Sequence, residues 1–187
     1  MLATLLKILP VLTVLLTVSF PLLIWWADGR IEPRWLALLL LCAVATRLPG
    51  LKLSRAARWS SLAALILVAL AVWANALLPL KLYPVLVNLA FLLVFAFSLA
   101  QPPSMIERFA RMQEPNLPPS AIGYTRRVTQ VWCVFFVING SIALGTALWA
   151  SQAVWSLYTG VIAYGLMGIL FAVEYWVRLR FKRLHDE

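Results

Sequence analysis

The sequence predicts an all-α polytopic membrane protein, a helical bundle of about six transmembrane helices with one short interfacial helix. Of its 187 residues, 63% are hydrophobic and only 12% are charged. The mean hydropathy of +0.90 is too high for the surface of a soluble domain. The apolar residues form continuous runs rich in Leu and Ala, whereas a transmembrane β-barrel would alternate apolar and polar residues. We therefore expect a single transmembrane domain over residues 1–187.

Six apolar runs, separated by clusters of charge, are the predicted spans, because a helix needs about 20 apolar residues to cross a bilayer. They cover residues 5–26, 35–47, 59–80, 82–100, 129–150 and 155–177. The first run has no small-residue cleavage site, so we interpret it as a retained helix and not as a signal peptide. The second run is apolar only from Trp35 to Thr46, which is short for a span. Five spans with an external amino terminus are therefore an alternative.

The basic residues predict how the chain is threaded, since Lys and Arg concentrate on the cytoplasmic side of membrane proteins. Six spans with both termini in the cytoplasm leave only Arg30, Arg34 and Lys81 outside. Five spans leave only Lys7 and Lys81 outside, so charge does not separate the two arrangements. Both place an amphipathic loop, residues 101–128, and a basic tail, residues 178–187, in the cytoplasm. Because this threading accounts for the net charge of +9, we expect no nucleic-acid binding.

The loop contains a predicted helix from Ser104 to Glu114. Ser104 and Glu107 have the spacing of a capping box, and Pro115 cannot continue a helix. One side of this helix is apolar and the other is charged, which is typical of a helix that lies among lipid headgroups. The apolar side carries Met105, Ile106, Phe109 and Met112, and the charged side carries Glu107, Arg108, Arg111 and Glu114.

Five residues of the loop form the candidate interface with lipid headgroups or with a partner protein. They are Arg108, Phe109, Arg111, Arg126 and Arg127. Basic residues next to a membrane attract anionic lipids. Ordinary anchoring of the following span is the alternative role for Arg126 and Arg127.

Polar residues at membrane depth form the second candidate site. Asn88, Asn139 and Tyr164 lie near the middle of the fourth, fifth and sixth predicted spans, where they could converge on a polar pocket. The alternative is that they make hydrogen bonds that hold the helices together. Glu174 lies one turn from the cytoplasmic end of its span, and Arg178 follows at the spacing of a helical ion pair.

No pattern in the sequence is typical of catalysis or of a bound cofactor. We find no nucleophile with its base, no paired carboxylates and no glycine-rich phosphate loop. The two cysteines and the single histidine do not combine into a metal site. We therefore expect a protein that is not an enzyme and that holds neither a cofactor nor a metal.

Two stretches of the later half of the chain are "KLYPVLVNLAFLLVFAFSLAQPPSMIERFARMQEPNLPP" and "YTRRVTQVWCVFFVINGSIALGTALWAS". Through them, residues 81–180 resemble a functionally uncharacterised family of bacterial inner-membrane proteins, often encoded among genes for aryl-polyene and fatty-acid-like biosynthesis. More distantly, they are similar to the intracellular septation protein A family. That similarity rests on Lys81 and Pro84 at the start of a span, on "PSMIERF", on Leu117-Pro118 and on a W-x-x-F-F-x-x-x-G pattern. The pattern consists of Trp132, Phe135, Phe136 and Gly140.

The resemblance implies a multi-pass protein of the bacterial inner (plasma) membrane that supports cell-envelope or aryl-polyene, lipid-linked biosynthesis without catalysing a reaction. It would act as a scaffold, in contact with membrane lipids and binding envelope or lipid-biosynthesis proteins through its cytoplasmic loop. The alternative function is a small protein that binds or transports a lipid or acyl chain in a mid-membrane pocket formed by Asn88, Asn139 and Tyr164. The sequence predicts no particular oligomeric state.

Overall fold

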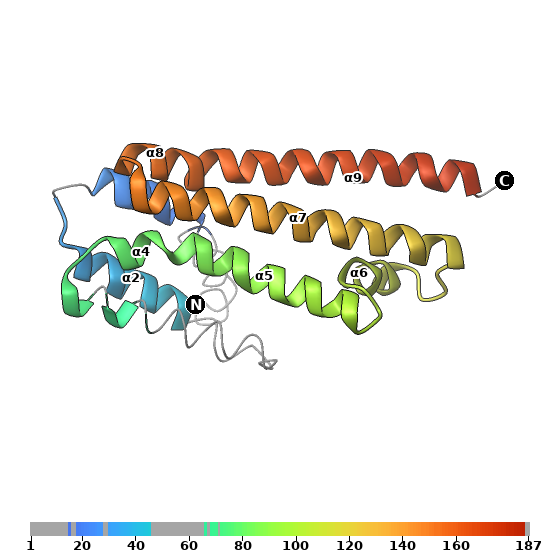
Figure 1. Cartoon of the computed structure of the whole chain (residues 1–187), viewed down its shortest axis with the longest axis horizontal. Coiled ribbons are helices and arrows are strands. Elements are labelled where there is room, and N and C mark those ends of the chain that lie inside the picture. The colour runs from blue at the N-terminus through green and yellow to red at the C-terminus, as the bar shows by residue number, and fades with distance from the viewer. Residues whose placement is uncertain are drawn as a thin grey trace, which may run out of the picture.

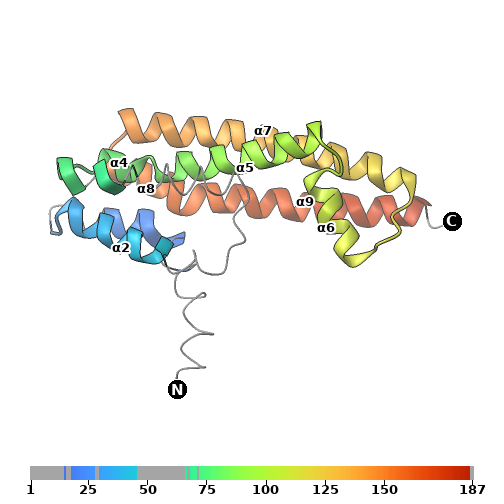
Figure 2. The same cartoon turned by 90° about the horizontal axis from the view of Figure 1, so that it is seen from below.

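The structure, a computed structural model, describes residues 15, 18–27, 30–45, 66, 68–70 and 72–185. Within these ranges the secondary structure is helical and no strand occurs, which confirms the predicted all-helical class for this part of the chain. Three long helical segments run side by side, with the amino-terminal helices gathered at one end of them (Figure 1). The short helix α6 (Met105–Gln113) lies at the other end, as the perpendicular view in Figure 2 also shows.

The three long segments are long and apolar enough to cross a membrane, and they match the last three predicted spans. They are Leu78–Ala100, which joins α4 (Leu78–Lys81) and α5 (Tyr83–Ala100); α7 (Pro119–Trp149); and Gln152–Arg180, which joins α8 (Gln152–Leu157), the π-helical segment η2 (Tyr158–Ile162) and most of α9 (Ala163–His185). Their outward surfaces are apolar, with exposed side chains such as Leu93, Ile138 and Ile169. Such surfaces are suited to contact with lipid.

The predicted count of about six spans is not confirmed, since the described residues contain three candidate spans. The second predicted span, residues 35–47, is α2 (Pro33–Ala45). Its 13 residues extend about 20 Å, and residues 46 and 47 of the predicted span lie outside the described residues. The first and third predicted spans, residues 5–26 and 59–80, fall only partly within the described residues. Of these, residues 15, 18–26, 66, 68–70, 72–74 and 78–80 are helical.

The loop and the tail are both shorter than predicted. Helix α7 begins at Pro119, so the last ten residues assigned to the loop are helical. Proline suits this first position because the N–H group that it lacks would have no partner inside the helix, and because its φ is already helical. At the other end, α9 continues to His185, so most of the predicted tail, residues 178–187, is helical as well.

The boundary between the third and fourth predicted spans is also wrong. The prediction placed it at Lys81, but that residue is the last of α4 and lies inside the candidate span Leu78–Ala100. The chain turns instead at Asn75, which has a φ of 45°. Asparagine is one of the few residues that adopt this left-handed conformation readily. The Asn75 Oδ1 atom accepts a hydrogen bond from the backbone N–H of Arg34 at 3.4 Å, so the same residue caps the start of α2.

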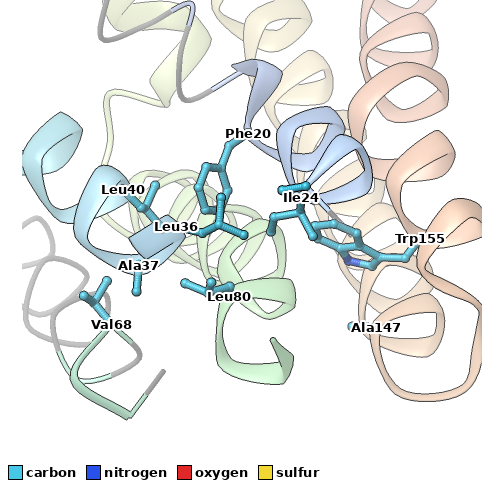
Figure 3. Packing of buried hydrophobic residues seen from close by; sticks show 10 residues of the cluster. Phe20, Ile24, Leu36, Ala37, Leu40, Val68, Leu80, Ala147 and Trp155 are labelled. Carbon is cyan, nitrogen blue, oxygen red and sulfur yellow. The ribbon is translucent and has the colours of Figure 1, made fainter. Parts of the chain in front are cut away.

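The amino-terminal helices are held to one end of the three long segments by a buried cluster that includes Trp155. Figure 3 shows its ring among Ile24, Ala147 and neighbouring apolar side chains. The Trp155 Nε1 atom donates a hydrogen bond to the Lys81 carbonyl at 3.2 Å. Ser156 Oγ donates to the Pro21 carbonyl at 2.7 Å, which ties the α8 segment to the amino-terminal helix. Every polar atom that these contacts bury is therefore paired.

An aromatic cluster packs α5 against α7 near the end that carries α6. Phe95, Trp132 and Phe136 are its buried members. The Phe95 and Phe136 rings meet edge to face, with centroids 5.2 Å apart. The Trp132 ring also contacts Phe171 of α9 at 4.6 Å. This cluster joins all three long segments, and the start of α6 packs against it.

Candidate functional site

Helix α6 is docked on the bundle through its amino-terminal end. The predicted capping box has its return bond, from the Ser104 N–H to Glu107 Oε2 at 3.4 Å, while the buried Ser104 Oγ makes no hydrogen bond with a described residue. The Met105 N–H donates to Ser98 Oγ of α5 at 2.9 Å, and the Ile106 N–H donates to Thr129 Oγ1 of α7 at 3.3 Å. The first N–H groups of a helix have no partner inside it. Here hydroxyl groups from two neighbouring helices accept their hydrogen bonds.

The orientation of both hydroxyl groups explains why they can accept. Ser98 Oγ donates its proton to the Phe95 carbonyl at 2.7 Å, and Thr129 Oγ1 donates to the Thr125 carbonyl at 2.9 Å. Each hydroxyl proton is therefore used within its own helix, which leaves the lone pairs for α6. Ser98 is 2% exposed and Thr129 is fully buried, so neither has water as an alternative partner.

Glu107 was predicted on the charged outer side of α6, and this prediction is wrong. The residue is buried, and its carboxylate forms an ion pair with Arg111, with Oε1 2.8 Å from Nη2. The charge lies in the first turn of α6, where the helix dipole stabilises a negative group. Glu107 therefore helps to fix the docked end of α6 and is not available to a partner.

The apolar side of α6 divides into an inner and an outer pair. Met105 and Ile106 pack against the aromatic cluster. Phe109 and Met112 instead point outward and are 49% and 81% exposed. We call the outer pair, together with Arg108, the α6 outer face. The Arg108 Nε atom donates to the Pro103 carbonyl at 2.9 Å, so the guanidinium is held beside this face.

The remaining candidate arginines serve different purposes. Arg111 is used within the loop, because it pairs with Glu107 and also donates from Nη1 to the Pro115 carbonyl at 3.3 Å. Arg126 and Arg127 were assigned to the loop, but they lie on α7 and are exposed. Neither forms an ion pair with another residue in the described part of the chain. The structure therefore does not gather all five candidate interface residues into one surface.

The structure brings Asn88 and Asn139 together near the middle of the bundle. Asn139 Nδ2 donates to Asn88 Oδ1 at 2.9 Å, and Asn88 Nδ2 donates to the Pro84 carbonyl at 2.9 Å. Tyr158 completes the chain of hydrogen bonds, since its hydroxyl donates to Asn139 Oδ1 at 2.7 Å. All three side chains in this network are buried.

Tyr164 does not belong to this network, contrary to the prediction. Its side chain is 40% exposed, and Tyr158, six residues earlier, occupies the place expected for it. Six residues of α-helix separate two side chains by about 240° and 9 Å, so the two tyrosines face different ways, and the π-helical turn η2 between them changes the rotation further. Counting α-helical turns along the sequence could not anticipate that rotation.

Gly140 explains how α5 and α7 come close enough for the two asparagines to meet. A Cβ atom at this position would lie 3.1 Å from the Cβ atom of Asn88. Small residues allow this close approach of helices in membranes. The glycine that ends the W-x-x-F-F-x-x-x-G pattern therefore has a packing role, and Trp132 and Phe136 of the same pattern belong to the aromatic cluster.

The predicted ion pair between Glu174 and Arg178 is confirmed, with Oε1 2.7 Å from Nη2. Tyr124 of α7 is close to it, and its hydroxyl donates to the Glu174 carbonyl at 3.2 Å. This contact ties the start of α7 to the later part of α9. Apart from this contact, the backbone of α7 lies close to the backbone of α9 in few places.

The described residues contain no group of three His, Cys, Asp or Glu side chains that could hold a metal ion. No family model, curated protein or solved structure matches the chain. The two resemblances drawn from the sequence therefore stay predictions.

Proposed function

We propose that this chain is a non-catalytic protein of the bacterial inner membrane that supports cell-envelope or aryl-polyene, lipid-linked biosynthesis by binding a partner protein through the α6 outer face. One observation carries the proposal. Helix α6 is fixed to the bundle by its amino-terminal end, while Phe109 and Met112 point away from the bundle.

The outward position of Phe109 and Met112 is not required to hold α6 in place. A nine-residue helix would be marginal alone, but the hydrogen bonds that its backbone donates to Ser98 and Thr129, and the packing of Ile106, stabilise it. An aromatic residue and a methionine beside an arginine have the composition of interface centres. A rigidly held helix also loses little conformational entropy when a partner binds.

The charge distribution favours a cytoplasmic position for this face. Several arginines belong to α6, to the start of α7 or to the end of α9, which lie at the same end of the bundle (Figure 1). They are Arg108, Arg111, Arg126, Arg127, Arg178 and Arg180. The positive-inside rule would place this end in the cytoplasm, where soluble biosynthetic enzymes and their partners can reach it.

The alternative function, a lipid site at Asn88 and Asn139, finds less support. The hydrogen bonds between Tyr158, Asn139 and Asn88 use the groups that would recognise a ligand. A buried network whose members are paired with one another mainly holds helices together.

Photocrosslinking in living cells tests the proposal. A benzoylphenylalanine would replace Met112 on the α6 outer face, and in a matched control it would replace Trp149. These residues are 81% and 83% exposed, but Trp149 lies at the opposite end of α7. We expect a discrete protein adduct at position 112, identified by mass spectrometry as an envelope or lipid-biosynthesis protein, and only lipid adducts at position 149.

A second variant separates binding from folding. Arg108→Gln should weaken the adduct at position 112 while leaving the helicity and thermal stability of the purified protein unchanged, because an exposed charge contributes little to stability. Equal adducts at positions 112 and 149, or an adduct that Arg108→Gln does not affect, would contradict the proposal.

A further inference from the structure

Helices α7 and α9 enclose a groove of about 620 Å³ at the end of the bundle that carries α6. Its volume is within the range of small-molecule sites, about 300–1,000 Å³. None of the candidate interface residues except Arg127 lines it, and the network of Asn88, Asn139 and Tyr158 lies elsewhere. The groove therefore shares only Arg127 with the candidate interface and no residue with the asparagine network.

The groove follows from the spacing of side chains on the two helices. On α7 its walls include Val128 and Val131, and on α9 they include Leu170 and Val173. The lining positions on each helix recur at intervals of three and four residues, so they form one face per helix. These two faces oppose each other, but the backbones of α7 and α9 come close together in few places. The short valine side chains do not fill the space between them, so a groove remains.

One contact closes the groove at its inner end, and a second joins its two walls near the loop. Trp132, against Phe171, forms the end toward the middle of the bundle. Tyr124, bonded to the Glu174 carbonyl, joins the walls near the loop, where Ser120 and Gly123 of α7 and Val177 of α9 continue the lining. The eight residue steps from Tyr124 to Trp132 correspond to about 12 Å along the helix axis. An apolar chain entering from the loop end would lie along this length.

The charge at the mouth of the groove is positive. Glu174 is its acidic lining residue, and that carboxylate is already paired with Arg178. Arg127 also lines the groove and forms no ion pair with a described residue. The uncompensated guanidinium favours an anion at the mouth, next to walls that favour hydrocarbon.

We propose that this groove binds a membrane lipid with an anionic phosphate headgroup, the phosphate at Arg127 and one hydrocarbon chain along Val128, Val131, Leu170 and Val173. A soluble anion would leave the apolar walls uncovered, and an uncharged chain would leave Arg127 without a partner. A phospholipid supplies both parts and can enter from the surrounding bilayer, since both helices are candidate spans. The inference does not depend on a partner for α6.

Native mass spectrometry of the full chain tests this proposal. The protein would be released from nanodiscs that contain equal amounts of phosphatidylglycerol and phosphatidylcholine with the same acyl chains, and the retained lipid would be counted. We expect retained phosphatidylglycerol in excess. Arg127→Gln should reduce that retention about fivefold, as the loss of one basic contact to an anionic lipid predicts.

Arg126→Gln is the matched control, because Arg126 is the preceding residue on the same helix, is exposed and does not line the groove. It should change retention less than twofold. Val131→Trp, which fills the groove, should reduce the retention of both lipids. Inorganic phosphate should not displace the lipid.

Three results would overturn the proposal. Equal losses from Arg126→Gln and Arg127→Gln would indicate general attraction to a basic surface. Displacement by inorganic phosphate alone would indicate a site for a free anion. Conversion of a dimer to a monomer by Val131→Trp, with lipid retention unchanged, would show that a second copy of the chain covers the groove.

Discussion

The replacement of Asn139 by alanine gives the most specific energetic prediction. Asn139 is 5% exposed and makes two hydrogen bonds, one from Tyr158 and one to Asn88. Hydrogen bonds between helices in membranes contribute about 0.6 kcal/mol on average and up to about 1.7 kcal/mol. Two such bonds give an expected loss of about 1–3 kcal/mol in the free energy of unfolding. The upper part of the range applies if the Tyr158 hydroxyl finds no new partner.

Unfolding in mixed micelles, with sodium dodecyl sulfate as denaturant and circular dichroism as the signal, measures this loss. Ser141→Ala is the matched control, since Ser141 is exposed and its hydroxyl bonds to the Val137 carbonyl of its own helix. We expect the control to change the free energy by less than about 0.5 kcal/mol.

A double-mutant cycle of Asn88→Ala and Asn139→Ala isolates the contact itself. We expect a coupling free energy of about 0.6–1.7 kcal/mol between the two positions. If the two losses add to within about 0.3 kcal/mol, the asparagines do not interact, and the packing of α5 against α7 described above is incorrect.

Two further substitutions test other contacts of the bundle. Gly140→Ala should lower the free energy of unfolding by about 1–2 kcal/mol in the same assay, because the added methyl group would lie 3.1 Å from the Asn88 Cβ atom. This loss should exceed the gain of about 1 kcal/mol from the higher helix propensity of alanine. A gain in stability would contradict the close approach. Thr129→Val should remove the hydroxyl that accepts a hydrogen bond from the Ile106 N–H. A protease should then cut the loop around α6 faster in limited proteolysis, while the long segments stay intact. An unchanged cleavage rate would show that this hydrogen bond does not hold α6.

The parts of the fold that depend on local sequence could be predicted. Helix α6 is an example, because Ser104, Glu107 and Pro115 determine its start and end through contacts between near neighbours. The ion pair of Glu174 with Arg178 is another, since helical spacing alone brings the two together. The three last spans follow from apolar length in the same way.

The parts that depend on tertiary position could not be predicted. Glu107 is buried because the start of α6 docks on α5 and α7. The spacing of apolar and charged residues in the sequence does not show where that docking occurs. The place predicted for Tyr164 is taken by Tyr158, which lies six residues earlier, at the start of a π-helical turn. The groove beside Arg127 results from the distance between two helices, although the valines in its walls are visible in the sequence as ordinary apolar residues.

The central claim is that α7 crosses the membrane with α6 on the cytoplasmic side, and cysteine accessibility tests it most directly. Met112→Cys and Trp149→Cys would be made separately in a protein whose Cys42 and Cys133 are replaced by alanine. Both positions are highly exposed and lie at opposite ends of the bundle, so they should react equally well wherever the reagent reaches them. We predict that a membrane-impermeant maleimide labels position 112 only in inverted vesicles and position 149 only in intact spheroplasts. Labelling of both positions from the same side, or the reverse pattern, would contradict the account.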